Sequence, residues 1–235
     1  MREQRTIHLR PAAAAAPRAL LPGDPGRALA LAQELIDSPK MFNHHRGLWG
    51  YSGPAKADGQ PLLIQSTGIG GPSAAIVLEE LILLGLSCAV RVGTCGALHP
   101  ALQLGDVVLA TEALAADGVG RLLSGDRVSA SESLSQALSC CAQPTLAGLI
   151  VSTDLFYEPA ASGRQASWRA AGALAIEMEA AALFALAAKR EIAIGCLLIV
   201  SDVFGSHGER RRIDDELLLA RARSVGAAAV RASGA

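Results

Sequence analysis

Apolar runs of strand length alternate with helical patterns along the chain. From residue 61 the apolar run PLLIQST leads into the glycine turn GIGG, then into the helical pattern PSAAIVLEELILLG and a second apolar run, SCAVRVGTCGA. Pro72 suits the first turn of a helix, where no N–H donor is needed, and Gly85 is typical of the position just after a helix end. Residues 61–97 therefore predict a βαβ unit.

The same two patterns continue over the rest of the chain. Apolar runs that are typical of strands buried on both faces occupy residues 105–111, 146–153 and 193–202. Helical patterns occupy residues 28–36, 177–190 and 214–232. Residues 117–135 and 158–170 are polar or rich in glycine and serine, and predict loops with room for short helices. Because neither a repeat nor a linker is present, we expect one α/β domain over residues 1–235.

Composition narrows the class of protein. Hydrophobic residues make up 51% of the 235 residues and charged residues 18%, so most of the chain must be buried or packed against a partner, which favours a homo-oligomer. A net charge of −1 gives no overall field for nucleic acid or an anionic membrane. No apolar run is long enough to span a bilayer, and the first 21 residues lack a signal-peptide pattern. The five cysteines form no C-x-x-C pair, which predicts reduced thiols and a cytoplasmic location.

Two glycine-rich turns are candidate ligand sites. In LPGDPGR, residues 21–27, a turn into a helix offers free backbone N–H groups to an anion, and Arg27 adds a guanidinium, although an ordinary turn with a surface arginine has the same sequence. The turn STGIGG, residues 66–71, lacks the G-x-G-x-x-G spacing of dinucleotide sites and instead suits close approach of a ligand to the backbone.

Arg91 lies within an apolar strand pattern. Burying an unpaired guanidinium costs on the order of several kcal/mol, so Arg91 needs an anionic partner. That partner is either an anionic ligand or a structural ion pair with Glu79 or Glu80. Thr94 and two glycines follow Arg91 and would suit the ligand.

Histidines give a weaker signal. His44 and His45 are adjacent, so in a strand they would point to opposite faces, and no other ligand accompanies them; we expect no metal site. His8, near the terminus, is typical of a solvent-facing histidine.

Two further strand ends carry candidate chemistry. Phe156 and Tyr157 close the run STDLFY and are either core residues or a stacking platform for a planar ring. Asp202 closes the run ending in VSD and is either a cap or a proton donor in a cleft.

The pentapeptide IEMEA places Glu177 and Glu179 on either side of Met178. Acidic residues favour the positive end of a helix dipole by about 0.3–1 kcal/mol, which accounts for their charge. It does not account for the methionine between them. An ionised carboxylate can accept several hydrogen bonds at once, as a ligand with hydroxyl groups would require.

The motifs GDPGR, TGIGGPSAAIVLEEL, RVGTCGA, STDLFY, IEMEAAALF and VSD, in this order and spacing, resemble the nucleoside phosphorylase family, which includes bacterial purine nucleoside and uridine phosphorylases. The resemblance extends from His8 to Asp202. It implies one α/β domain around a mixed, partly barrel-like sheet flanked by helices, assembled as dimers grouped into hexamers.

The resemblance also implies roles for particular positions. The implied phosphate-binding residues are Gly23, Arg27, Arg91 and Thr94, with Arg46 reaching into a neighbouring subunit's site. The implied ribose contacts are Glu177, Met178 and Glu179, with His8 supplied by a neighbour. The implied base contacts are Cys95, Gly96, Phe156, Ile176 and Asp202. Asp202, Arg27 and Arg91 would be the catalytic residues, with Asp202 protonating purine N7 or hydrogen-bonding to it.

The implied reaction is phosphorolysis of purine nucleosides to a free base and ribose 1-phosphate, with inorganic phosphate as co-substrate and with neither cofactor nor metal. Uridine phosphorylases carry a G-Q-x-R pattern after the FY pair; FYEPAASGRQ lacks it, although Arg164 and Gln165 lie close by and keep uridine as an alternative. Further alternatives are a nucleosidase of the same fold, disfavoured by the retained arginines, and a nucleoside-binding homologue without turnover. Residues 117–135 are short for the family. The resemblance also implies an arginine after VSD that assists Asp202; Arg210, Arg211 and Arg212 are the candidates, but they lie closer to Asp202 than the family spacing, so the role stays unassigned.

Overall fold

The computed structural model describes residues 6–157, 163–204 and 209–234. The strands are β1 (Arg18–Leu21), β2 (Lys40–Asn43), β3 (Gly50–Pro54), β4 (Pro61–Gln65), β5 (Cys88–Ala97), β6 (Val107–Ala116), β7 (Arg127–Ser129), β8 (Leu146–Thr153), β9 (Ala175–Glu177), β10 (Ala193–Phe204) and β11 (Arg210–Arg212). The helices are α1 (Pro25–Leu35), η1 (His45–Gly47, a 3-10 turn), α2 (Gly71–Leu83), α3 (Gly118–Ser124), α4 (Glu132–Ala142), α5 (Arg164–Ala170), α6 (Ala180–Arg190) and α7 (Asp215–Ser233).

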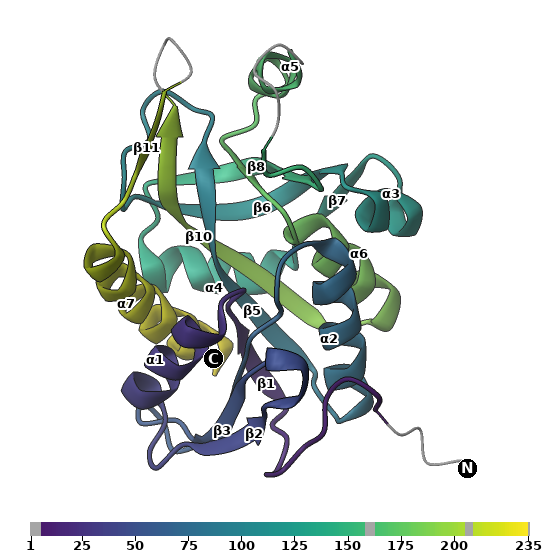
Figure 1. The fold of residues 1–235 in the computed structure, drawn as a ribbon, viewed down its shortest axis with the longest axis vertical. Coiled ribbons are helices and arrows are strands. Elements are labelled where there is room, and N and C mark those ends of the chain that lie inside the picture. Colours follow the sequence, from purple (N-terminus) through teal and green to yellow (C-terminus); the bar gives the residue numbers. More distant parts are fainter. Residues whose placement is uncertain (1–5, 158–162, 205–208, 235) are drawn as a thin grey trace.

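Five strands close into a barrel in the order β5, β10, β6, β8 and β9, with β9 pairing back onto β5. The barrel is mixed, because β5–β10, β6–β8 and β8–β9 are parallel whereas β10–β6 and β5–β9 are antiparallel. Strands β1, β4, β3 and β2 extend the sheet outward from β5 (Figure 1). This architecture confirms the expected α/β fold with a mixed, partly barrel-like sheet.

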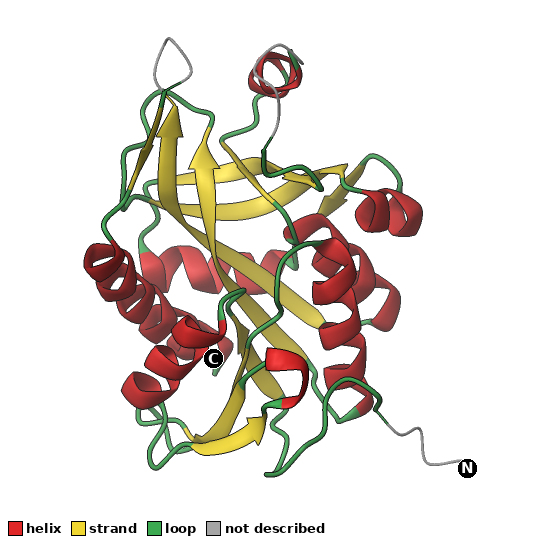
Figure 2. Cartoon of the chain, in the orientation of Figure 1, coloured by secondary structure: helices red, strands yellow, loops and turns green. Residues whose placement is uncertain are grey.

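Two groups of helices cover the sheet (Figure 2). Helices α1 and α4 both pack on α7, and α2 and α3 both pack on α6. Along β10, Leu198 joins the core beneath α2 and α6, whereas Leu197 and Ile199 join the core beneath α1, α4 and α7. Successive side chains of a strand point to opposite faces, so the continuous apolar run of β10 feeds both cores.

The βαβ prediction for residues 61–97 is confirmed as β4, α2 and β5. Because β4 and β5 both run parallel to β1, and β10 runs parallel to β5, the carboxyl ends of these strands face one edge of the sheet. The glycine turns that follow β1 and β4 therefore lie at the same edge, where ligands bind in open α/β folds.

The loops expected at 117–135 and 158–170 carry the short helices α3 and α5, for which the prediction left room, and Asp117 caps α3 by accepting a hydrogen bond from the Gly120 N–H group. Other local predictions were wrong. Strand β7 lies in the expected loop at 117–135. The expected strand at 105–111 continues as far as Ala116. The helix expected from residue 177 begins at Ala180, and Glu177 is the last residue of β9.

The histidine pair also differs from expectation. His44 follows β2 and His45 begins η1, so the two are not neighbours within a strand. All five cysteines are free thiols, as predicted. Within the described residues, no helix combines the length and the apolar character that a bilayer span requires.

Packing between α1 and α7 gives a testable consequence. A Cβ atom on Gly226 would lie 2.8 Å from Leu31 Cδ2 and 3.0 Å from Leu35 Cδ1, so Gly226→Leu overpacks this contact. We expect the free energy of unfolding, measured by urea denaturation, to fall by about 1–3 kcal/mol. Ala220→Leu, on an exposed position of the same helix, should change it by less than about 0.5 kcal/mol. Equal effects of the two substitutions would contradict this packing.

Candidate active site

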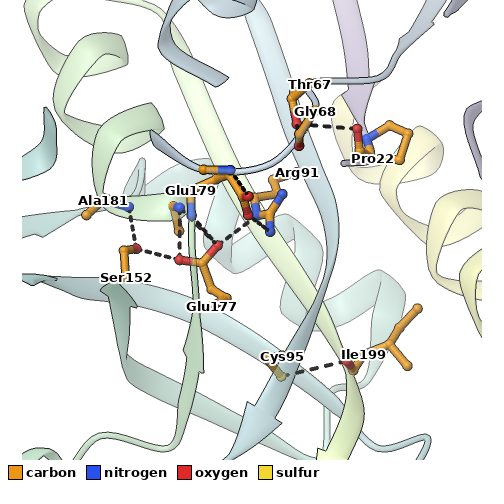
Figure 3. A network of polar contacts seen from close by, with 12 residues as sticks. Pro22, Thr67, Gly68, Arg91, Cys95, Ser152, Glu177, Glu179, Ala181 and Ile199 are labelled. Carbon is orange, nitrogen blue, oxygen red and sulfur yellow. Dashed lines mark hydrogen bonds and ion pairs between the residues drawn. The ribbon is translucent and has the colours of Figure 1, made fainter. Parts of the chain in front are cut away.

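The turns after β1 and β4 lie against each other. Thr67 N donates to Pro22 O at 2.9 Å (Figure 3). Gly68 N donates to Gly23 O at 3.0 Å. A Cβ atom on Gly23 would lie 3.2 Å from Gly68 O, so glycine is needed for this close approach. The two turns that the sequence predicts as ligand sites thus form one surface.

Arg91 is buried beside this surface and bonded to both glutamates of IEMEA (Figure 3). Its Nε donates to Glu177 Oε2 at 3.0 Å and its Nη2 donates to Glu179 Oε2 at 2.5 Å. A Cβ atom on Gly93 would lie 2.7 Å from Arg91 Cζ, so the glycine two residues on leaves the space that the guanidinium fills. Burial disfavours the charged form of Arg91, but Glu179 and Glu177 outweigh it and raise its pKa above the ordinary arginine value.

Arg91 does form a structural ion pair, as one alternative predicted, but its partners are Glu177 and Glu179 and not Glu79 or Glu80. Glu79 pairs instead with the exposed side chain of Arg190 on α6. Glu80 accepts hydrogen bonds from the N–H groups of residues 7–9 and pairs with His8 Nδ1 at 2.8 Å. Neither Glu79 nor Glu80 of α2 is therefore the partner of Arg91.

Glu177 is fully occupied by protein groups. Its carboxylate accepts hydrogen bonds from Ser152 Oγ, from the Glu179 N–H group at 2.9 Å and from the Ala180 N–H group at 3.0 Å. Ser152 Oγ in turn accepts from the Ala181 N–H group at 2.9 Å. Glu177 therefore satisfies the first backbone donors of α6 and holds Arg91, which is a structural task. Ser152 begins the STDLFY segment, but nothing in the sequence indicates this role.

Glu179 joins Arg91 to the glycine turn. Its Oε1 accepts from the Gly70 N–H group at 2.5 Å, and Gly70 has φ +87°, a left-handed conformation that favours glycine. Burial raises the pKa of Glu179, Arg91 lowers it, and Glu177 raises it again, so the net direction is upward. Met178, between the two carboxylates, is half-buried.

Arg27 completes a positive cluster at this edge. Burial lowers the pKa of Arg27, as do the nearby charges of Arg91 and Arg212, whereas Asp24 and Glu179 raise it. The structure thus places Arg27 within electrostatic range of Arg91 and Glu179, which lie 64 or more positions away in the sequence. Arg91 Nη1 is buried and has no hydrogen-bond partner among the described residues. An unpaired buried donor on a guanidinium is suited to an incoming anion.

A second group of predicted residues gathers around Asp202. Asp202 Oδ1 accepts from Arg210 Nε at 2.8 Å and Oδ2 accepts from Ser201 Oγ at 2.6 Å. Arg210 Cζ lies 4.2 Å from the centre of the Phe156 ring, a cation–π contact. Of the three arginines at 210–212, the structure therefore pairs Arg210 with the acid. Sequence spacing could not identify it, because the chain returns along β10 as β11.

The base-contact residues of β5 and β9 lie next to this acid. Gly96 pairs with Ile176 of β9 and with Asp202 of β10, where the β10 register shifts. A Cβ atom on Gly96 would lie 2.9 Å from Phe204 Cε2, so glycine is required there. Cys95 is buried, and burial raises the pKa of its thiol, so the side chain is a neutral core group.

Three predicted residues are not brought into contact with these groups. His8 is held on α2 by Glu80, and the ring of His45 bonds to His8 O, so His8 is ordered and not the free surface histidine expected. Arg46 is exposed, with φ +60°. Thr94 is half-buried, and its hydroxyl makes no hydrogen bond within the described ranges.

Two hollows lie elsewhere, one of about 210 Å³ beside α7 and one of about 600 Å³ along β6 and α4. Neither is lined by the arginines or carboxylates described above. We place the site at the arginine cluster because an unpaired buried charge donor is a stronger indication of a ligand than volume alone.

The sequence matches the family described as "Phosphorylase superfamily" over residues 17–233. The chain belongs to the phosphorylase superfamily. It is 37% identical, over 81% of its length and 84% of the relative, to a protein of Alkaliphilus metalliredigens named purine nucleoside phosphorylase DeoD-type. It is 35% identical, over 85% of its length and 84% of the relative, to a guanosine phosphorylase of Halorubrum lacusprofundi.

Solved structures agree with this assignment. The phosphorylase-superfamily chain superposes on a uridine phosphorylase from Vibrio fischeri with a TM-score of 0.83 and 25% identity, covering 94% of this chain and 92% of the other. The expected family and its fold are therefore confirmed.

The buried arginine makes a prediction about stability and pH. Arg91→Met leaves Glu177 and Glu179 without their cation, and we expect the free energy of unfolding to fall by about 3–5 kcal/mol at neutral pH. Loss of Arg91 raises the pKa of Glu179 further, so the folded state binds a proton that the unfolded state has released. Stability of the variant should therefore recover as the pH falls toward about 4.3, the ordinary glutamate value.

Urea denaturation at several pH values measures both effects. Arg190→Met, which removes an exposed arginine paired with Glu79, is the matched control and should cost less than about 1 kcal/mol with little pH dependence. A variant at position 91 that behaves like this control would contradict the proposed electrostatic role.

Proposed function

We propose that this protein catalyses phosphorolysis of purine nucleosides, in which inorganic phosphate attacks the anomeric carbon and releases the base and ribose 1-phosphate. The observation that carries the proposal is the Arg91 guanidinium, which is bonded to two carboxylates yet retains a buried Nη1 donor beside Arg27. Water needs no such cationic site, so the arrangement favours phosphorolysis over hydrolysis.

The anion would be held where the two glycine turns meet Arg27 and Arg91. Gly23 permits close approach of the backbone, and Thr94 supplies a hydroxyl that makes no hydrogen bond to the residues the structure describes. We propose that Arg46 of a neighbouring subunit adds a further guanidinium, since its side chain is exposed. Bound phosphate would then both supply the nucleophile and stabilise the positive charge that develops on the sugar.

The sugar would lie against Glu179 and Met178. The Arg91 guanidinium bonds to Glu179, and a carboxylate paired in this way can still accept hydrogen bonds from the 2′ and 3′ hydroxyl groups. Its Oε1 already accepts from the Gly70 N–H group, so Glu179 is held in one orientation. We assign Glu177 to positioning Arg91, and we propose that His8 of a neighbour completes the 5′ end of this site.

The base would lie among Gly96, Ile176 and Phe156, with Asp202 at its edge. Arg210 donates to Asp202, and we propose that this acid protonates or hydrogen-bonds to purine N7 as the base leaves. The relatives named above as purine nucleoside and guanosine phosphorylases support purines. Likeness to a uridine phosphorylase makes uridine the second candidate substrate.

We further propose a cytoplasmic homo-oligomer built from dimers, with hexamers as the expected size, that uses phosphate as co-substrate and requires no cofactor. The family assignment supports nucleoside and phosphate as its partners. The near-neutral chain gives no reason to expect a nucleic-acid or membrane partner.

Phosphate dependence is the first test. Purified protein should release free base from inosine, adenosine or methylthioadenosine in the presence of phosphate, with ribose 1-phosphate or its 5-methylthio derivative as the other product. Chromatography of the base measures the rate, and a parallel reaction with uridine tests the second candidate. Equal release without phosphate would favour a nucleosidase, and no release of any base would favour a binding protein.

Asp202→Asn is the second test. The amide keeps the shape of the side chain but cannot give up a proton, so we expect kcat for purines to fall by about 10²- to 10⁴-fold while KM for phosphate changes little. Asp214→Asn, at the start of α7, is a matched control because asparagine caps helices equally well. Unchanged purine turnover in the position-202 variant would reject the acid role of Asp202.

A further inference from the structure

Ser152 is a fully buried polar residue to which the proposed reaction gives no part. Strands β8 and β9 run parallel, and their register places Ser152 opposite Glu177. The Ser152 hydroxyl accepts a hydrogen bond from the Ala181 N–H group at 2.9 Å and donates its proton to Glu177 Oε1. A serine hydroxyl has one proton, so Glu177 is the group that this proton serves.

The two oxygens of the Glu177 carboxylate bind different groups. Oε2 accepts from Arg91 Nε at 3.0 Å and from the Glu179 N–H group at 2.9 Å, whereas Oε1 accepts from Ser152. The Ala180 N–H group lies 3.0 Å from both oxygens and therefore does not favour one rotation of the carboxylate over another. The last torsion angle of a glutamate has a broad minimum, so hydrogen bonds to the oxygens must set it. Among the described residues, Ser152 is the one donor that binds Oε1 alone.

The rotation of this carboxylate decides where Arg91 points. The guanidinium is planar, and its Nε and Nη2 atoms are held by Glu177 and Glu179 respectively. Two such contacts fix the plane and direct the third corner, Nη1, which is buried without a partner among the described residues. If the Glu177 contact shifts, the guanidinium can turn about its remaining contact with Glu179, and Nη1 moves with it.

We propose that Ser152 is a positioning residue for the anionic co-substrate: its hydroxyl fixes the Glu177 carboxylate, which in turn holds Arg91 so that Nη1 faces the phosphate. This inference rests on the proposed function and adds to it a residue to which neither the motifs nor the family resemblance assigned a role. It also gives the STDLFY segment two tasks, because Ser152 acts at the phosphate and Phe156, four residues on, acts at the base.

Kinetics of Ser152→Ala test the proposal. We expect KM for phosphate to rise by about 10- to 100-fold, because a small misplacement of a binding group costs up to about 100-fold, while KM for the nucleoside changes by less than about threefold. Ser135→Ala is the matched control, because it removes another buried hydroxyl, one that has no hydrogen-bond partner in the described part of the chain. It should leave both constants unchanged.

Ser152→Thr separates positioning from stability. Threonine keeps the hydroxyl but adds a methyl group at a fully buried site, so the melting temperature should fall while KM for phosphate stays within about threefold of wild type. Ser152→Cys keeps the shape of the side chain with a weaker donor, and it takes the place of Ser152→Ala should the alanine variant not fold. A KM for phosphate that follows the melting temperature across these variants would assign Ser152 to stability alone.

A double-mutant cycle tests whether Ser152 acts through Glu177. In a Glu177→Gln background the carboxylate that Ser152 orients is gone, so Ser152→Ala should raise KM for phosphate by less than about twofold. An undiminished effect of Ser152→Ala in this background would contradict the route through Glu177.

A binding measurement separates this proposal from the reaction itself. Inorganic phosphate should raise the melting temperature of the wild type and of Ser135→Ala, and Ser152→Ala should need about 10- to 100-fold more phosphate for the same shift. If the wild type cleaves nucleosides without phosphate but this difference remains, the proposed reaction fails and Ser152 still positions the anion site. Equal phosphate responses of Ser152→Ala and Ser135→Ala, in both KM and melting temperature, would overturn the assignment.

Discussion

The site depends on the burial of one guanidinium inside the sheet. Arg91 lies on β5 and is buried. Its charge is tolerated because Glu177 and Glu179 pair with it and because Gly93, which has no Cβ atom, leaves room for the guanidinium. Those carboxylates come from β9 and from the residue before α6, so the ion pairs join β5, β9 and α6. The same contacts that hold β9 and α6 against β5 therefore position the carboxylates of the site.

The two glutamates of IEMEA divide this task. The Glu177 carboxylate accepts hydrogen bonds from Arg91, from Ser152 and from the first N–H groups of α6, all of which belong to the protein itself. Glu179 also bonds to Arg91, but its second oxygen meets the Gly70 N–H group in the glycine turn. Glu177 therefore stabilises the fold around Arg91, and Glu179 links Arg91 to the glycine turn at the proposed ligand site. Residues two apart at a strand end project from the same side, so both carboxylates can reach the Arg91 guanidinium.

The local sequence pattern was sufficient to predict the βαβ unit and the glycine turns. It was also sufficient to predict that Arg91 needs an anionic partner. It was not sufficient to choose that partner. Glu80 lies on the helix just before β5, whereas Glu177 lies 86 residues away along the chain and is brought beside Arg91 by the pairing of β9 with β5. Arg210 was missed for the same reason, because the return of β11 along β10 decides which arginine meets Asp202. In both cases the deciding contact is between strands that sequence periodicity cannot pair.

The surface offered to a neighbouring subunit is connected to the same framework. Glu80 of α2 holds the backbone of residues 7–9, and the ring of His45 bonds to His8 O, so the N-terminal segment and the turn that carries Arg46 form one unit. Helix α2 begins at Gly71, directly after the Gly70 N–H group that Glu179 binds. If His8 and Arg46 complete a neighbour's site as proposed, α2 carries those residues at one end and the protomer's own ligand turn at the other. The two ends of α2 would then contribute to two different sites of the assembly.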